Sequence, residues 1–343
     1  MNGKTRIRNT VLRRPVDRRP VDFTAVDEVR ERLRRHFHGA TDRAVLDALG
    51  VDVFWAGEPE SLKPATRTED FRVDYWGVRR RRQDYGHGTY WEPCDYPLDS
   101  AETPAEVERH PWPDPDDFDY DGYLEKLGNQ PDRAACCGLG SVFYVPTLLR
   151  ELSRVLMDMV LNPALVDALV ARVVEFQLEY YERIFRKCRG CLDIFHVADD
   201  YGTQSGLMFD KAMWRRFFRH GPSRLVELAH RYDIPVMLHS CGSVRELIPD
   251  FIDVGVDILD PIQTTAAGMD IVELKSEFGR DLCFHGAIDT QDILNSGTVG
   301  EVRDHVRRTI EVLGEGGGYI IAPCHNIQVS APLENILTLY ETA

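Results

Sequence analysis

The second half of the chain alternates short apolar segments with longer amphipathic ones in a regular order. The apolar segments have the length of strands, and the predicted strands are 192–198, 234–239, 256–260, 281–286 and 318–322. Helical spacing follows each strand, and the predicted helices are 211–231, 243–254, 270–278, 298–314 and 332–342. Strands that alternate with helices pair in parallel, so this half of the chain predicts an α/β fold with a parallel sheet.

The first half of the chain adds three further strands to this pattern. These predicted strands are 21–24, 51–55 and 133–142, with helices at 26–36, at 42–49 and from Pro163 onward. Eight strand and helix units fit a closed (β/α)8 TIM barrel, and 343 residues suit one domain of this kind, here 1–343. Residues 70–96 differ, because short aromatic and β-branched segments around Gly77, Gly86 and Gly88 predict an inserted hairpin or lid.

Composition excludes several classes of protein. Asp and Glu outnumber Lys and Arg by 56 to 41, and the net charge of -15 argues against a nucleic-acid partner. An apolar segment of membrane-spanning length is lacking, and the basic first 19 residues lack the apolar core of a signal peptide. We therefore expect a soluble, cytoplasmic protein whose eight cysteines stay reduced.

Polar residues gather where the predicted strands end. Active sites of TIM barrels lie at the carboxyl ends of the strands. The segments at these positions are 199–204, 239–241, 260–263, 285–289 and 324–328. Asp and Gln beside Gly or Pro also satisfy backbone groups in turns, so each single position has a structural alternative.

Three residues of these segments suggest a zinc site. On a strand that runs through residue 241, His239 and Cys241 face the same side, because side chains two residues apart point the same way. Cys324 follows another apolar segment. Zinc binds imidazole nitrogen and thiolate sulfur, and three protein ligands leave a fourth position for water or substrate. The alternative is a chance pair at a strand end, with Cys324 as a small buried hydrophobic residue.

Two other motifs imitate metal sites. Cys188 and Cys191 are spaced like half of a zinc knuckle, but a second Cys-x-x-Cys pair is lacking. The acidic loop from Asp117 follows the order of a calcium loop through Gly122, yet Gly128 stands where a bidentate Glu is needed. We expect neither motif to bind a metal ion.

The chain resembles the superfamily of uroporphyrinogen decarboxylase and the corrinoid-dependent methyltransferases. The similar segments run through nearly the whole sequence in order, and they are Asp17-Arg-Arg-Pro-Val21, Tyr75-Trp-Gly-Val78, Trp112-Pro-Asp-Pro115, Asp199-Asp-Tyr-Gly-Thr-Gln204, His239-Ser-Cys-Gly242, Gly286-Ala-Ile-Asp-Thr-Gln291, Gly316-Gly-Gly-Tyr319, His325-Asn-Ile-Gln328 and Glu334-Asn335. The decarboxylase branch carries an Arg-Gln-Ala-Gly-Arg segment after its first strand. Here residues 22–27 read Asp-Phe-Thr-Ala-Val-Asp, so the resemblance favours the methyltransferase branch.

That branch binds zinc through a His-x-Cys pair and a later cysteine, which correspond to His239, Cys241 and Cys324. The resemblance implies transfer of a methyl group between the cobalt of a corrinoid (cobalamin), carried by a partner protein, and a small molecule. The small molecule is a thiol or a methyl donor, such as a methoxylated aromatic or a methylamine-type compound. The alternatives are a porphyrinogen-type decarboxylase and a zinc-bearing barrel that binds a corrinoid protein without catalysis. A homodimer is compatible with any of them.

The resemblance and the strand ends also assign roles to polar residues. The residues expected to orient the substrate or supply a proton are Asp199, Asp200 and Gln204. The residues expected to contact the substrate are Tyr201, Gln263, Asp289, His325, Asn326 and Gln328.

Overall fold

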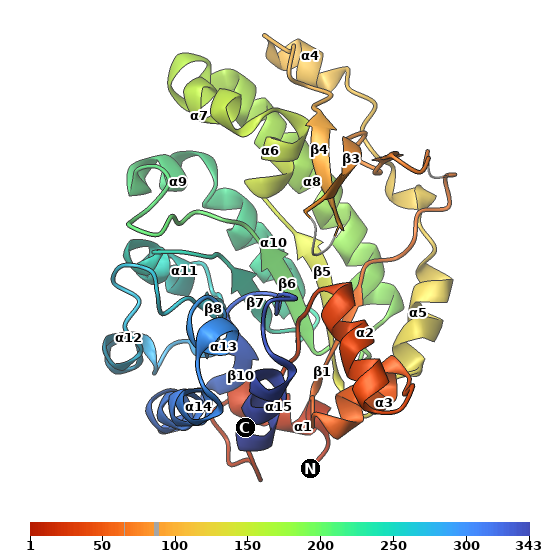
Figure 1. Cartoon of the computed structure of the whole chain (residues 1–343). Coiled ribbons are helices and arrows are strands. Elements are labelled where there is room, and N and C mark those ends of the chain that lie inside the picture. The colour runs from red at the N-terminus through yellow and green to blue at the C-terminus, as the bar shows by residue number, and fades with distance from the viewer. Residues whose placement is uncertain (65, 86–88) are drawn as a thin grey trace.

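Seven parallel strands form the central sheet of the protein. The structure is a computed structural model that describes residues 1–64, 66–85 and 89–343. The strands, in their order across the sheet, are β1 (Val53–Gly57), β5 (Ala134–Gly140), β6 (Ile194–Ala198), β7 (Val236–His239), β8 (Ile258–Ile262), β9 (Cys283–Ile288) and β10 (Tyr319–Pro323). Each strand pairs with the next in the chain, and the sheet curls with its helices outside (Figure 1).

An extended segment, residues 20–26, closes the gap between the two edge strands. It exchanges backbone hydrogen bonds with Ile321 of β10 and with Ile327, and the carbonyl of Val21 accepts from Asp52 beside β1. The predicted strand 21–24 is therefore reduced to two isolated bridges, at Val21 and Ala25. Pro20 cannot donate a backbone hydrogen bond, which favours an irregular edge. The predicted (β/α)8 class is confirmed.

Helices cover the outside of the barrel. In chain order they are α2 (Asp27–His36), α3 (Asp42–Ala48), α5 (Tyr120–Gly128), α8 (Pro163–Lys187), α9 (Lys211–Phe217), α10 (His220–His230), α11 (Ile248–Asp253), α12 (Ile271–Phe278), α13 (Ile293–Ser296), α14 (Val299–Gly314) and α15 (Leu333–Thr342). Shorter elements beside them are α4 (Pro104–Glu108), α6 (Tyr144–Leu149), α7 (Leu152–Leu161) and the 3-10 turns η1 (Pro115–Asp117) and η2 (Arg245–Leu247).

Proline explains where two predicted helices differ from the observed ones. The predicted helix 211–231 is broken between α9 and α10, because Pro222 lacks an N–H and its ring would clash with the carbonyl of Phe218 in a continuous helix. The predicted helix 243–254 begins as η2 and becomes α-helical only at Ile248, next to Pro249.

An additional helix, α1 (Gly3–Val11), closes the bottom of the barrel, at the amino ends of the strands (Figure 1). Ile7 of α1 is 1% exposed and packs into a cluster to which every strand of the main sheet contributes. These partners are Val53, Ala134, Cys136, Ile194, Met237, Ile258, Cys283 and Ile320. The basic N-terminal residues gave no sign of this helix, because its apolar contacts come only from Ile7 and the partly buried Val11.

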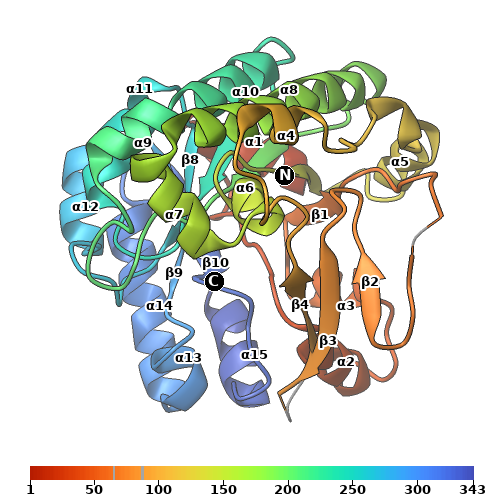
Figure 2. The ribbon, with the colours of Figure 1, turned by 90° about the horizontal axis from the view of Figure 1, so that it is seen from above.

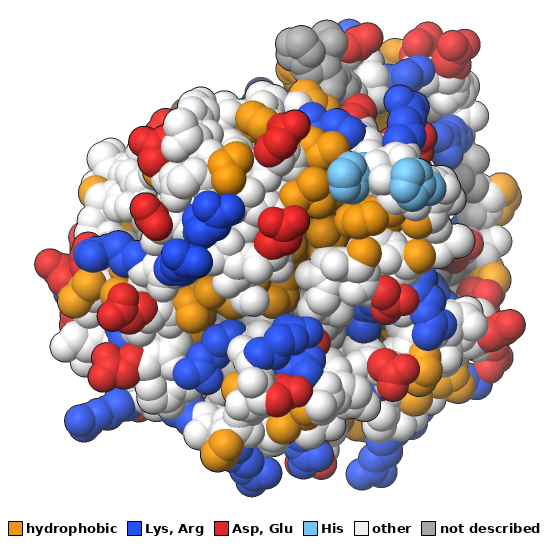
Figure 3. All heavy atoms as spheres, turned by 60° about the horizontal axis from the view of Figure 1, so that its bottom comes forward, with side chains coloured by type: hydrophobic (Ala, Val, Ile, Leu, Met, Phe, Trp, Pro, Cys, Tyr) orange, Lys and Arg blue, Asp and Glu red, His pale blue; other side chains and the backbone are white. Residues whose placement is uncertain are grey.

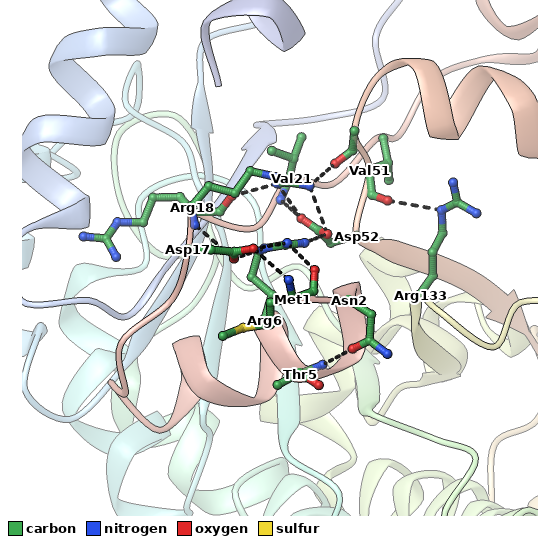
Figure 4. A network of polar contacts seen from close by, with 12 residues as sticks. Met1, Asn2, Thr5, Arg6, Asp17, Arg18, Val21, Val51, Asp52 and Arg133 are labelled. Carbon is green, nitrogen blue, oxygen red and sulfur yellow. Dashed lines mark hydrogen bonds and ion pairs between the residues drawn. The ribbon is translucent and has the colours of Figure 1, made fainter.

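Charged side chains fasten α1 to the barrel (Figure 4). Arg6 donates to Asp17 at 2.8 and 2.9 Å and also to Asp52, which precedes β1. Asp52 further accepts from Arg18 at 2.8 Å and from the backbone N–H of Val21 at 2.9 Å. One buried carboxylate thus joins α1, the closing segment and β1.

The predicted excursion at 70–96 forms a separate antiparallel sheet, which we call the lid. Its strands are β2 (Phe71–Val73), β3 (Arg79–Asp84) and β4 (Thr89–Asp95). Seen from above, the lid stands over one side of the ring of helices (Figure 2), and in Figure 1 its strands β3 and β4 stand above α2 and α3. Gly86 and Gly88, which helped to predict the hairpin, lie outside the described residues.

The surface agrees with the acidic composition. On the face shown in Figure 3, Lys and Arg side chains are interspersed with Asp and Glu rather than joined into one basic area. Within the described part of the chain, none of the helices combines the length and the apolar character needed to cross a membrane.

Candidate active site

A cavity of about 830 Å³ opens at the carboxyl ends of the strands. Loops that follow β6 to β10 line it, together with three residues of the lid region, Tyr85, Tyr90 and Glu92. Most of the predicted site residues lie in its wall, and these are Asp200, Gln204, Cys241, Gln263, Asp289, Cys324, His325, Asn326 and Gln328. The strand ends therefore bring together residues that are far apart in the sequence.

Two of the predicted zinc ligands are adjacent. The Nε2 atom of His239 lies 3.3 Å from the Sγ atom of Cys241. Strand β7 ends at His239, so the turn after the strand, rather than strand alternation, brings the two side chains together. Asp200 joins them, because its Oδ1 atom lies 3.8 Å from Nε2 of His239 and accepts from the Cys241 N–H at 2.9 Å.

Cys324 reaches the same cavity from the end of β10. Its thiol is 6% exposed and donates to the carbonyl oxygen of Ile262 at 3.1 Å. The compact groups of metal-ligand atoms found among the described residues are Asp200 with His239 and Cys241, and His196 with His239 and Asp260. Cys324 belongs to neither group, and burial raises the pKa of its thiol to about 12.

A network of buried imidazoles and carboxylates lies beneath His239. Asp260 of β8 accepts from Nδ1 of His239 at 2.7 Å and from Nδ1 of His285 at 2.6 Å. The Nε2 atom of His285 lies 3.1 Å from Asp22, to which Trp55 also donates at 2.9 Å. None of these residues was given a role from the sequence. Their polar side chains interrupt otherwise apolar strands, and that pattern indicates inward-facing functional groups.

The charges in this network stabilise one another. Burial alone would lower the pKa of His239, but the Asp260 carboxylate raises it well above its ordinary range. Burial would likewise raise the pKa of Asp260, yet the imidazoles of His285 and His239 hold it well below its ordinary range. Asp260 is therefore a carboxylate that keeps Nδ1 of His239 protonated, and Nε2 points toward Cys241.

Three predicted site residues are not part of the cavity wall: His239, described above, and the buried Asp199 and Tyr201. Asp199 is 1% exposed and accepts from the Ser141 hydroxyl at 2.6 Å and from the hydroxyl of Tyr201 at 2.8 Å. Its two oxygens also accept from the backbone N–H groups of residues 142–144. These contacts give Asp199 a structural role in holding the loop after β5, and its predicted catalytic role stays a prediction.

The lid supplies residues that sequence reasoning did not include in the site. The hydroxyl of Tyr90 donates to the Gln328 side chain at 3.1 Å, so the lid contacts the segment after β10 across the cavity. Tyr90 and Glu92 are two residues apart on β4 and therefore face the same side. This spacing was readable from the sequence, but the direction in which the strand faces was not.

The rejected motifs carry no metal cluster in the described residues. Cys188 is buried at the end of α8, and burial raises the pKa of its thiol to about 11. Asp119 caps α5 by accepting from the N–H of Gly122 at 2.9 Å. Neither residue belongs to the groups of metal-ligand atoms named above.

The fold and the cavity define an α/β barrel whose polar residues converge at the carboxyl ends of its strands. Residues 126–343, more than half of the chain, match the uroporphyrinogen decarboxylase (URO-D) family. The chain belongs to this family. Curated protein sequences show no match to it.

Solved structures support the same fold. A methyltransferase from Methanosarcina mazei superposes with a TM-score of 0.71 at 18% sequence identity, and the alignment covers 100% of this chain and 98% of that one. Similarity at this level of identity shows the shared fold. The 3-keto-D-glucoside 4-epimerase of E. coli is more distant, with a TM-score of 0.40, 12% identity, and coverage of 65% of this chain and 82% of that one.

Proposed function

We propose that this protein is a zinc-dependent methyltransferase. It moves a methyl group between the cobalt of a corrinoid, carried by a partner protein, and a small-molecule thiol or methyl donor. The observation that carries the proposal is the adjacency of His239 Nε2 and Cys241 Sγ at 3.3 Å, with Cys324 in the wall of the same cavity. The family resemblance also implies a zinc site with these ligands, at which a methyl group is transferred.

The residues present fit a zinc ion. One imidazole nitrogen and two sulfur atoms are donors that zinc prefers, and three protein ligands leave a position open for a substrate. The hydrogen bond from Nδ1 of His239 to Asp260 fixes the imidazole so that Nε2 faces Cys241, an arrangement common around metal-binding histidines, and a zinc ion would replace the proton on Nε2. Cys324 has to give up its hydrogen bond to Ile262 before its sulfur can serve as the third ligand.

Bound zinc would supply Lewis acidity that keeps a coordinated thiol deprotonated near neutral pH. The side chains of this protein would position the ligands and accept a proton. Gln263 accepts from the N–H of Gly242 at 2.8 Å and so holds the turn that carries Cys241. Asp200, half exposed beside His239, is placed to accept the proton that a thiol substrate loses.

The transfer to a thiol balances without an additional reagent. A carbon–sulfur bond forms, the carbon–cobalt bond breaks, and the electron pair of that bond stays with the cobalt of the partner. The thiol proton leaves through Asp200 to solvent. With a methyl donor as substrate, the electron pair of cobalt(I) forms the carbon–cobalt bond. The bond between the methyl carbon and its heteroatom breaks, and its electron pair leaves with the heteroatom of the demethylated product.

Decarboxylation of uroporphyrinogen fits this cavity poorly. Substrate carboxylates call for arginine or lysine, and neither occurs among the described residues of the cavity wall. The segment 22–27, where the decarboxylase branch carries arginines, instead places Asp22 in the buried network with Trp55 and His285. We therefore expect negligible turnover of uroporphyrinogen.

Metal analysis and methylcobalamin demethylation of purified variants test the proposal. Cys324→Ser exchanges a thiolate for a poor zinc ligand with little change in volume, so it should lower zinc content and methyl transfer together. Asp200→Asn should retain zinc, and Cys191→Ser, outside the cavity, should behave like the wild type. Loss of zinc in Asp200→Asn but not in Cys324→Ser would assign the compact group Asp200, His239 and Cys241 as the ligands instead.

The remaining outcomes separate the other functions. Stoichiometric zinc without methyl transfer to any thiol, and without methyl uptake by cob(I)alamin from any donor, would favour the non-catalytic corrinoid-binding barrel. Turnover of uroporphyrinogen at the rate of a dedicated decarboxylase would overturn the proposal.

A further inference from the structure

The cavity wall is acidic and aromatic. Its charged or ionisable side chains are Glu92, Asp200, Asp289, His325 and the thiols Cys241 and Cys324, and its other polar members are amides and hydroxyls. Lys and Arg are absent from the described residues of this wall. The proposed zinc site would not reverse this balance, because two thiolate ligands neutralise the charge of the ion. A small molecule in the cavity therefore meets negative rather than positive side chains.

The lid wall concentrates these features. Tyr85 and Tyr90 are 59% and 42% exposed, unusual for large aromatic side chains, and their ring centroids lie 5.8 Å apart with the planes nearly perpendicular. Glu92 accepts from the Tyr85 hydroxyl at 3.2 Å. In the described part of the chain Glu92 forms no ion pair with Lys or Arg, so its charge is left available. Two ring faces beside a carboxylate form half of the kind of cage that holds ammonium groups.

The opposite wall adds negative charge near the proposed metal ligands. The side chain of Asp200 is 51% exposed and lies 3.8 Å from His239. Asp289 contributes less, because its oxygens already accept from the backbone N–H groups of Gln291 and Ile293. An elongated substrate could thus place one end at His239 and Cys241 and the other between Asp200 and the lid.

Three arginines of the lid lie over aromatic rings and outside the cavity wall. Arg79 and Arg81 lie over the ring of Phe71, at 4.0 and 5.3 Å from its centroid. Arg72 lies over Trp91 at 4.9 Å. None of these residues lines the cavity, so the lid presents its tyrosines and Glu92 to the substrate space, although Arg81 stands opposite Glu92 in the pairing of β3 with β4.

We propose that the substrate carries a positively charged ammonium group, which is held by Tyr85, Tyr90 and Glu92 of the lid. This inference rests on the proposed function and narrows it to cationic substrates. The ammonium group belongs either to a thiol acceptor, as in an aminothiol, or to a methyl donor, as in a methylated amine. Carboxylate or sulfonate substrates meet no paired cation in the cavity wall and are disfavoured.

Calorimetric binding to the purified zinc protein, without any corrinoid, tests this assignment. Choline serves as the cationic probe, and 3,3-dimethylbutan-1-ol is its neutral isostere. We expect choline to bind at least about tenfold more tightly, because the two probes share shape but only one has a charge. Equal affinity of the two probes would overturn the inference.

Variants of the lid locate the binding site. Glu92→Gln removes the charge and Tyr90→Leu removes a ring, and each should weaken choline binding about fivefold to tenfold while leaving the neutral probe unchanged. Tyr90→Phe keeps the ring and should bind choline like the wild type, as should Glu125→Gln, an exposed charge-matched control on α5. Tight choline binding that none of the lid variants changes would also overturn the inference.

Methyl transfer assays then distinguish the two sources of the ammonium group. Demethylation of methylcobalamin is compared for 2-aminoethanethiol, 2-mercaptoethanol and 3-mercaptopropionate, and methylation of cob(I)alamin is measured with choline. Preference for the aminothiol or activity with choline supports the inference. Equal transfer to all three thiols would overturn it while the proposed function stands. If choline binding depends on Glu92 but no methyl transfer occurs in either direction, the ammonium-binding site is supported and the proposed methyltransferase function is refuted.

Discussion

The two ends of the barrel differ in how exposed and how well paired their carboxylates are. At the bottom, the Asp52 side chain is 4% exposed and is bound by Arg6 and Arg18. At the mouth, the Asp200 side chain is 51% exposed and has His239 beside it at 3.8 Å. The bottom is filled by Ile7 and its apolar neighbours, whereas the mouth encloses a cavity.

This difference indicates that the bottom of the barrel stabilises the fold, whereas the mouth keeps polar groups available for binding. At the bottom the Asp52 carboxylate is paired with two guanidinium groups and Ile7 is packed against the strands, so the folded state uses both side chains. At the mouth carboxylates, amides and thiols keep binding capacity that the fold does not use, as is usual at the carboxyl ends of barrel strands. A substitution at either end should therefore affect one property and spare the other.

The largest expected effect is at the mouth. Cys241→Ser should lower zinc content and reduce methyl transfer about a thousandfold, which corresponds to about 4 kcal/mol in activation free energy. The unfolding midpoint of the metal-free protein should change by less than about 3 °C, because Cys241 is partly exposed and the barrel core is untouched. Metal analysis, transfer rates and thermal unfolding of the metal-free variant measure both effects, and wild-type activity in this variant would contradict the proposed ligand set.

The matching change at the bottom is Ile7→Ala. It leaves a cavity where seven strands meet α1, so the free energy of unfolding should fall by about 3 kcal/mol. Zinc content and the transfer rate of the folded protein should remain those of the wild type. Urea unfolding beside activity at low urea measures this, and a loss of activity larger than the loss of folded protein would show that the two ends are coupled.

The smallest effect, counted per pH unit, concerns the buried network between the two ends. Burial alone would lower the pKa of His285, but Asp260 and Asp22 raise it to about 9, above its ordinary 6.5. Because protonation then favours the folded state, this contribution is complete below about pH 6.5 and is lost as pH rises through about 9. One proton gives a decrease of at most about 1.4 kcal/mol per pH unit.

Urea unfolding of metal-free protein between pH 6 and pH 9.5 measures this slope. His285→Gln cannot carry the charge, so the variant should be less stable at pH 6 and should lose less stability as pH rises. A slope that is the same in the variant and the wild type would show that another group is responsible.

Periodicity was enough to predict the barrel and the strand ends at which the cavity opens. The helix breaks at Pro222 and Pro249 and the reduced first strand were not predicted, because hydrophobic spacing describes the buried face and not backbone continuity. Helix α1 was missed for a related reason, since its buried face combines Ile7 and the partly buried Val11 with Gly3, Arg6 and Thr10, and so few apolar side chains produce no periodic signal.

The sequence by itself determined which side chains stand at the carboxyl ends of the strands, because strand ends can be located from apolar runs and parallel pairing puts those ends at one edge. It also singled out His239, Cys241 and Cys324 by residue type. Tertiary structure alone decided that Asp260 joins His239 to His285, that Asp199 is used up by backbone N–H groups, and that the lid turns Tyr90 and Glu92 toward the cavity. These outcomes depend on the curvature of the sheet and on which face of a strand points inward, and contacts between residues distant in the chain set both.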